Sequence, residues 1–340
     1  MKKVFHSQNY NYIFNLENGL FIRWGKTKED NPSYSEFGPE ILDIEISTIC
    51  SNNCSFCYKS NKPKGKNMTL ETFKQLFDKF PKTLTQIAFG IGDIDANKDL
   101  WEIMDYCRKH NVIPNITING KRMTETDYDN LVKYCGAVAV SLYDENTCYN
   151  AVQELTKRGL KQTNIHCLLA DETFERCKKV MCDSLIDQRL KNLNAIVFLW
   201  LKPKGQRNIF HQLTDMNKFK ELIDFAFKHN IKIGFDSCSS SNFLKAIKNH
   251  PDYKSIEEMV EPCESTLFSF YINVEGKGFP CSFSEGIYNG IDILASKDFI
   301  KDVWFGAETV DFRQKVLNTE KDNICRKCPL YNLQLCEATI

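Results

Sequence analysis

Short apolar runs alternate with amphipathic stretches through most of the chain. The apolar runs predict strands at 42–48, 85–90, 112–118, 137–143, 164–170 and 195–201, with a weaker one at 231–235. The amphipathic stretches predict helices at 69–80, 98–110, 124–134, 146–158, 171–191 and 216–229. Strands that are apolar throughout and alternate with helices indicate βαβ units around a parallel sheet that is covered on both faces. Six such units are fewer than the eight of a closed barrel, so we expect an α/β fold with an open, partial (β/α)6 barrel.

The two ends of the chain follow other patterns. Residues 10–24 hold two apolar-aromatic runs around Asn18–Gly19, which predicts a short N-terminal β-hairpin. Residues 267–283 predict a second hairpin that turns near 275–278, and a cysteine-bearing tail follows it. We therefore expect three parts: a hairpin extension over 1–40, the partial barrel over 41–240 and a small C-terminal domain over 241–340.

Charge and hydropathy narrow the possible partners. The 340 residues include 44 Lys+Arg and 44 Asp+Glu, a formal net charge of zero, so global charge does not favour a nucleic-acid or anionic-membrane partner. No apolar run approaches the roughly 20 residues of a membrane span. The N-terminus lacks the apolar stretch of a signal peptide. We predict a cytoplasmic protein with no membrane and no nucleic-acid partner.

Cysteine is unusually frequent, with fifteen residues. In a large chain without an export signal thiols are expected to stay reduced, and clustered thiols then indicate metal ligands. Seven cysteines are scattered singly, and we interpret them as small buried side chains: Cys107, Cys135, Cys148, Cys167, Cys177, Cys182 and Cys238. The other eight form spaced groups near the two ends: Cys50, Cys54, Cys57, Cys263, Cys281, Cys325, Cys328 and Cys336.

The first cysteine group has the spacing C-x3-C-x2-C and directly follows the first predicted strand. Loops at the carboxyl ends of parallel strands carry the chemistry of such folds. The thiolates of Cys50, Cys54 and Cys57 can hold three irons of a cubane cluster and leave the fourth open to an external molecule, whereas electron-transfer clusters use four cysteines. An open zinc site is the alternative, but zinc favours mixed Cys/His sets and no His lies near this loop.

This loop resembles the CxxxCxxC signature of the radical S-adenosylmethionine (SAM) superfamily, with Phe56 as the aromatic residue before the third cysteine. The resemblance implies a [4Fe–4S] cluster on Cys50, Cys54 and Cys57 that binds SAM at its open iron. It further implies reductive cleavage of SAM to a 5′-deoxyadenosyl radical that abstracts hydrogen from a substrate, with electrons from an external donor such as flavodoxin or ferredoxin. The protein then supplies positioning and exclusion of water, while the cofactor supplies the chemistry.

Three further strand ends are similar to motifs of this superfamily. Gly92 and Asp93 stand in a segment that resembles its GGEP motif, with Asp93 in place of the Glu. Asn119 belongs to a T-x-N-G sequence after the third strand, and Ser141 ends the fourth. The resemblance implies that SAM contacts Phe56, Gly92, Asp93, Asn119 and Ser141. Turn chemistry for Asn119 and a local backbone bond for Ser141 are the alternatives.

The second cysteine group resembles a twitch domain, the shorter relative of the SPASM domain. It combines a C-x12-G-x4-C run through Gly276 with a later C-x2-C pair. The resemblance implies a second, auxiliary [4Fe–4S] cluster on Cys263, Cys281, Cys325 and Cys328, with Cys336 as an alternative ligand. A structural zinc knuckle built from the same thiols is the other interpretation.

The substrate is less well specified. Relatives with twitch or SPASM domains modify peptides, protein side chains or small molecules such as sugars. The forty residues before the barrel are short for a leader-peptide-binding domain, and Ser282 stands where sulfatase-maturating relatives place an Asp. We interpret Asp236 as a turn residue and name no catalytic residue.

We therefore expect a radical SAM oxidoreductase that acts on a peptide or a small molecule, with net oxidation or cross-link formation. One alternative is a dehydrogenase of a sugar-like small molecule. The alternative of another class is a non-catalytic protein that binds zinc or an iron–sulfur cluster as a scaffold.

Overall fold

The computed structural model describes residues 1–27, 30–261 and 263–318. Its largest sheet has ten strands in the order β10-β9-β8-β7-β6-β5-β4-β11-β12-β13. Seven of them run parallel in sequence order: β4 (Ile41–Glu45), β5 (Gln86–Gly90), β6 (Ile113–Ile118), β7 (Ala137–Ser141), β8 (Gln162–Leu169), β9 (Ala195–Trp200) and β10 (Ile233–Phe235). All seven coincide with the predicted strands.

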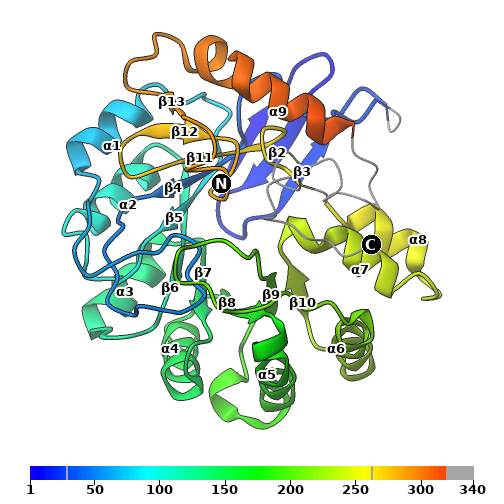
Figure 1. The fold of residues 1–340 in the computed structure, drawn as a ribbon. Helices are drawn as coiled ribbons and strands as arrows, with labels where there is room; N and C mark the ends of the chain where they lie inside the picture. The colour runs from blue at the N-terminus through cyan, green and yellow to red at the C-terminus, as the bar shows by residue number, and fades with distance from the viewer. Residues whose placement is uncertain (28–29, 262, 319–340) are drawn as a thin grey trace.

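Six helices connect these strands and lie outside the curved sheet (Figure 1). They are α1 (Leu70–Phe77), α2 (Leu100–Lys109), α3 (Glu125–Tyr134), α4 (Glu145–Lys157), α5 (Phe174–Ile186) and α6 (Met216–His229). The first begins as predicted, because the Thr69 side chain accepts a hydrogen bond from the amide of Thr72 at 3.1 Å. The predicted helix over 171–191 is shorter than expected, since Asp187 leaves the helical conformation and separates α5 from a 3-10 turn. The partial (β/α)6 barrel is confirmed.

The C-terminal part extends the same sheet. β11 (Ser269–Ile272) pairs in parallel with β4, and β12 (Lys277–Phe279) pairs antiparallel with β11. The predicted hairpin is therefore present, with its turn closed by a bond from the Gly276 amide to the Asn273 carbonyl. Gly276 has φ of +78°, which is costly for residues with a side chain. The parallel pairing with β4 brings this hairpin beside the cysteine loop.

Several elements were not predicted. They are β1 (Lys2–Phe5), α7 (Ser240–Ala246), α8 (Tyr253–Met259), β13 (Ile291–Asp292), a π-helix (Phe299–Trp304) and α9 (Ala307–Leu317). All of them except α9 have two to seven residues, too few periods for a pattern to be recognised, and the 11-residue α9 has only a weak amphipathic pattern. Cys325, Cys328 and Cys336 lie outside the described residues.

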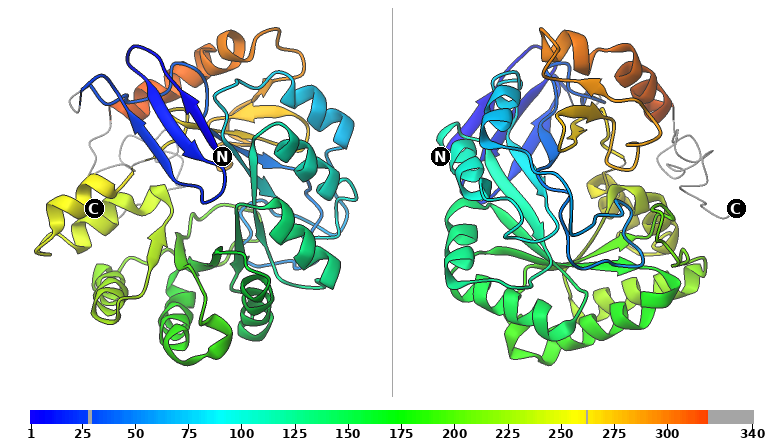
Figure 2. Two further views of the ribbon diagram at one scale, coloured as in Figure 1. Left: turned by 180° about the vertical axis from the view of Figure 1, so that it is seen from behind. Right: turned by 60° about the vertical axis from the view of Figure 1, so that its left-hand side comes forward.

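The predicted N-terminal hairpin is confirmed as β2 (Asn11–Asn15) and β3 (Phe21–Trp24), which form a separate antiparallel sheet with β1 (Figure 2). This sheet packs near the amino ends of the barrel strands. The Tyr12 hydroxyl donates to the Thr83 carbonyl at 2.8 Å, and Arg23 pairs with the buried Glu40 at 2.7 Å. The contacts fix the chain at Glu40, immediately before β4 begins.

Strand β4 shows how the sheet separates core from cavity. Leu42 and Ile44 are fully buried in the main hydrophobic core, while the alternate residues Asp43 and Glu45 line an internal cavity. No helix within the described part of the chain is long and apolar enough to cross a membrane.

Candidate active site

A cavity of about 530 Å³ opens at the carboxyl ends of the parallel strands. The ends of β4 to β9 line it, together with the loop that carries Cys50, Cys54 and Cys57. Tyr271 on β11 and Ser282 after β12 complete the wall. The cavity therefore lies where parallel α/β folds place their ligands.

The cysteine loop folds back on itself at the mouth of this cavity. The Cys57 amide bonds to the Cys54 carbonyl at 3.3 Å, and the Cys50 amide bonds to the Lys62 carbonyl at 2.9 Å. Asn53 makes the turn possible with φ of +48°, a conformation that Asn tolerates better than most residues. All three thiols are half-buried.

The three thiols lie close enough to affect one another. Burial raises the pKa of Cys54, and the neighbouring thiols of Cys50 and Cys57 raise it further. Burial also raises the pKa of Cys50. These pKa shifts favour protonated thiols in the metal-free loop, so the thiolates that ligate a metal need the positive charge of that metal beside them.

The donor set fits a cubane cluster. Cys50, Cys54 and Cys57 all line one cavity, and a cubane takes one thiolate at each of several corners. Among the described residues, no three Cys, His, Asp or Glu side chains stand as the ligands of one metal ion.

The segment after β5 touches the cysteine loop through a glycine. A Cβ at Gly92 would overlap the carbonyl oxygen of Ile49 and the Cβ of Cys50. The amide of Asp93 also bonds to the Ile49 carbonyl. The close approach of Gly92 therefore sets the position of the first cysteine.

The Asp93 carboxylate also holds the cysteine loop, through hydrogen bonds. It accepts hydrogen bonds from the Ser51 amide at 2.8 Å and from the Asn119 side-chain amide at 3.1 Å. Arg122 pairs with it at 2.9 Å. Asp93 is almost fully buried and does not line the cavity, unlike Gly92. In this structure Asp93 positions the loop.

The other predicted SAM-contact residues line the cavity. Phe56 packs between the rings of Tyr143 and Phe210, with centroid distances of 5.7 and 5.1 Å. The Asn119 side chain donates to the Gly92 carbonyl at 2.9 Å. Ser141 lies at the end of β7. The ends of β5, β6 and β7 and the cysteine loop thus surround one space.

A segment that was not predicted from the sequence contacts the cysteine loop. It comprises residues 201–210, which follow β9. The Ile209 amide bonds to the Ser55 carbonyl at 3.1 Å, and Arg207 donates to the Asn61 carbonyl at 2.8 Å. Gly205, with φ of +103°, lies so close to Cys57 that a Cβ would overlap its carbonyl oxygen. The only signal was a Lys-Pro-Lys-Gly-Gln-Arg run after a strand, which also describes an ordinary surface loop.

Paired charges occupy much of the cavity wall. Lys59 lies 3.2 Å from Glu45, donates to the Tyr271 hydroxyl at 2.6 Å and pairs with Glu285. Deeper in the barrel, burial lowers the pKa of His166 to about 4, so its ring is neutral near pH 7.

Two single residues of the sequence analysis lie in different environments from those expected. Asp236, interpreted as a turn residue, does precede a 3-10 turn, but it also lines the cavity and pairs with Lys202. Of the scattered cysteines, Cys182 was wrongly expected to be buried, since it lies on the exposed face of α5. Cys238 is half-buried, and the other five are buried as predicted.

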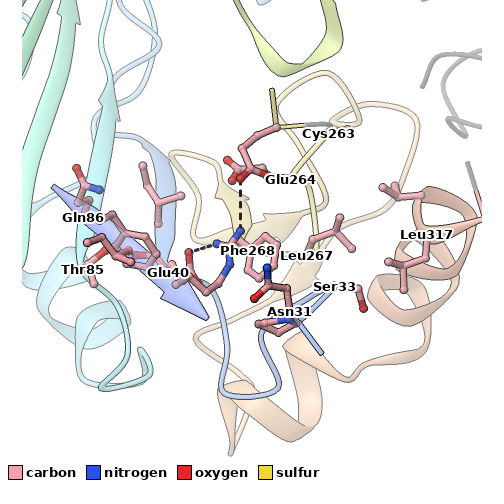
Figure 3. Close-up of a pocket in the computed structure, with 17 residues that line it drawn as sticks. Asn31, Ser33, Glu40, Thr85, Gln86, Cys263, Glu264, Leu267, Phe268 and Leu317 are labelled. Atoms are coloured by element: carbon pink, nitrogen blue, oxygen red, sulfur yellow. Dashed lines mark hydrogen bonds and ion pairs between the residues drawn. The ribbon is translucent and has the colours of Figure 1, made fainter. Parts of the chain in front are cut away.

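Cys263 lines a second cavity, of about 850 Å³, near the amino end of β4 (Figure 3). Figure 3 shows Glu40 and Thr85 on one side of it and Glu264 beside Cys263 on another. Burial, and to a lesser degree the Cys263 thiol, raises the pKa of the Cys281 thiol to about 11, so the two thiols lie within electrostatic reach of one another. The remaining predicted auxiliary ligands, Cys325, Cys328 and Cys336, lie outside the described residues.

Comparisons with known proteins agree with this geometry. The family model of the radical SAM superfamily matches residues 44–159. SuiB of Streptococcus suis superimposes with a TM-score of 0.70 at 13% identity, over 100% of this chain and 94% of SuiB. SuiB bound to precursor peptide SuiA gives 0.71 at 13% identity, with 100% and 95% covered. The structure of anSMEcpe with bound AdoMet and Cp18Cys peptide gives 0.59 at 19% identity, with 87% and 88% covered. No curated protein sequence matches significantly.

Proposed function

Because the chain carries a domain of the radical SAM superfamily, we propose that it binds SAM on a [4Fe–4S] cluster held by Cys50, Cys54 and Cys57. The observation that carries this proposal is the position of three neighbouring thiols at the mouth of a 530 Å³ cavity. When bound, the cluster supplies the electron for reductive cleavage of SAM, and SAM supplies the radical that removes hydrogen from the substrate. The substrate then occupies the cavity below the loop.

The chain's own residues hold the cluster loop in place. Gly92 lets β5 approach Cys50, and Asp93 fixes the Ser51 amide. On the opposite side Gly205 packs against Cys57. Because the loop lies between these two segments, the access of water to it is limited. A radical reaction requires that exclusion of water.

SAM is expected to contact Phe56, Gly92, Asn119 and Ser141, which all line the cavity, with Asp93 supporting them. Arg207 adds a candidate, because it lines the same cavity and its Nε atom is buried without a hydrogen-bond partner in the described part of the chain. A guanidinium group binds a carboxylate well, and SAM carries one.

An auxiliary cluster on Cys263, Cys281, Cys325 and Cys328, or with Cys336 as a ligand, remains part of the proposal. The proximity of Cys263 and Cys281 supports it. Such a cluster would offer a second redox group, which suits a net two-electron oxidation. The twitch-like domain over 241–340 would then serve the reaction and extend the barrel sheet through β11.

A peptide is the favoured substrate, and an external donor such as flavodoxin or ferredoxin in the cytoplasm would supply electrons. Two solved proteins with this fold are seen with peptides, SuiB with SuiA and anSMEcpe with Cp18Cys. Dehydrogenation of a small molecule is the second candidate, because the cavity also has the volume of a small-molecule site.

The decisive assay measures 5′-deoxyadenosine made from SAM by the anaerobic, reconstituted protein with dithionite. The wild type should produce it, and Cys54→Ala should lower the yield at least about a hundredfold because the loop loses one of three ligands. Cys182→Ala is the matched control, since that thiol is exposed on α5 outside the cavity. A colourless zinc protein without this product would support the scaffold alternative.

A further inference from the structure

One carboxylate in the cavity has a different environment from the others. Asp43 lies on β4, level with Ala88 on β5 and Tyr271 on β11. Its side chain faces the cavity, while the residues on either side of it are buried in the core. The carboxylate is open to the cavity but enclosed by the protein that surrounds it.

Asp43 has no hydrogen-bond or ion-pair partner among the described residues. The other carboxylates on this wall do have partners, because Lys59 pairs with Glu45 and Lys202 with Asp236. Lys204 donates to backbone carbonyls at 2.7 and 2.6 Å. These three lysines are thus committed to other groups.

A carboxylate without a protein partner that is exposed in a cavity is available to hydrogen-bond a ligand. Burial alone raises the pKa of Asp43 to about 6, so it is still ionised near pH 7. The titratable groups Tyr58 and Glu264 are affected by its charge, and neither carries a positive charge. A cation that enters the cavity would supply the partner that Asp43 lacks.

The depth of Asp43 separates it from the expected SAM contacts. It lies two residues before the end of β4, and Gly92 lies two residues beyond the end of the neighbouring β5. Asp43 stands opposite Ala88, which is four residues before Gly92 and below the carboxyl end of β5. A ligand that reaches Asp43 therefore enters the cavity more deeply than one that contacts Gly92.

We propose that the cavity selects a substrate with a positively charged amino or guanidino group, which binds to the Asp43 carboxylate. This rests on the proposed function, in which the cavity below the cluster holds the substrate. Charge-assisted hydrogen bonds from an ammonium or guanidinium group would replace the missing partner.

The test compares two probes on the reconstituted holoenzyme with SAM but without reductant. N-acetyl-lysine methylamide carries the ammonium group, and N-acetyl-norleucine methylamide lacks it. In titration calorimetry the wild type should bind the charged probe at least about tenfold more tightly, a preference that one charge-assisted hydrogen bond supplies. Asp43→Asn should abolish the preference, and Glu261→Gln, a carboxyl outside this cavity, should retain it.

A melting experiment gives a second, independent readout. The surrounding protein raises the pKa of Asp43 to about 6, so its ionised form lowers stability at pH 7.5, and Asp43→Asn should have a higher melting temperature than the wild type without any probe. Equal affinities for the two probes in the wild type, a preference that survives in Asp43→Asn, or a lower melting temperature of that variant would each overturn the proposal. The binding experiment needs no turnover, so a failure of SAM cleavage would contradict the proposed function and leave this test intact.

Discussion

At the residue scale, one glycine and one carboxylate fix the first part of the cysteine loop. Gly92 touches Ile49 and Cys50, where any side chain would overlap the loop. Asp93 holds Ser51 at 2.8 Å and is itself held by Asn119 and Arg122. The family resemblance suggested direct SAM contacts for these positions. The structure gives Asp93 a supporting part as well, through a network that no linear motif describes.

Gly92→Ala should displace Cys50 and reduce 5′-deoxyadenosine formation about a hundredfold, because a displacement of about 1 Å in a catalytic group has that effect. Gly90→Ala is the matched control. A Cβ at Gly90 meets its nearest neighbour, Glu45, at an ordinary 3.5 Å. Iron content should fall in the Gly92 variant and remain at the wild-type level in the Gly90 variant. Equal iron content in the two would show that the close contact at Gly92 is not what positions the loop.

At the scale of elements, the site depends on segments that are far apart in the sequence. The strands could be predicted because apolar runs of five to eight residues between helices are a strong signal. The cysteine loop could be predicted from its spacing alone. The segment 201–210 could not, since its value comes from contacts with Ser55, Cys57 and Asn61 and not from its own composition.

Gly205→Ala tests that segment. The substitution adds a Cβ that overlaps the Cys57 carbonyl, at a φ of +103°. Gly159→Ala is the control, because Gly159 has φ of +95° but no atom within 4 Å of its Cβ position. Both variants should lose about 1–2 kcal/mol of stability from backbone strain. Only the Gly205 variant should also lose iron from the loop, measured as iron per chain after gel filtration. Iron loss in both variants would mean that strain rather than overlap is responsible.

At the scale of the whole molecule, one sheet joins the barrel and the C-terminal part, which were predicted from the sequence as separate domains. β4 carries Asp43 and Glu45 on its inner face, leads into the cysteine loop, and pairs on its other side with β11. The alternation of side-chain directions along the strand could have indicated that Asp43 and Glu45 face inward. No sequence pattern shows which of the two carboxylates forms an ion pair with a lysine. That depends on Lys59, which reaches Glu45 and Glu285 from the cysteine loop. Pairing of charges across a barrel is a property of the assembled fold.

The open coordination site of the cluster is tested most directly by electron paramagnetic resonance. The dithionite-reduced holoenzyme would be mixed either with SAM that carries oxygen-17 in its carboxylate or with unlabelled SAM. If three cysteines leave one iron free for SAM, the labelled sample should show hyperfine broadening of the cluster signal, and Cys54→Ala should show no such signal. Identical spectra from labelled and unlabelled SAM in the wild type would contradict SAM binding at that iron.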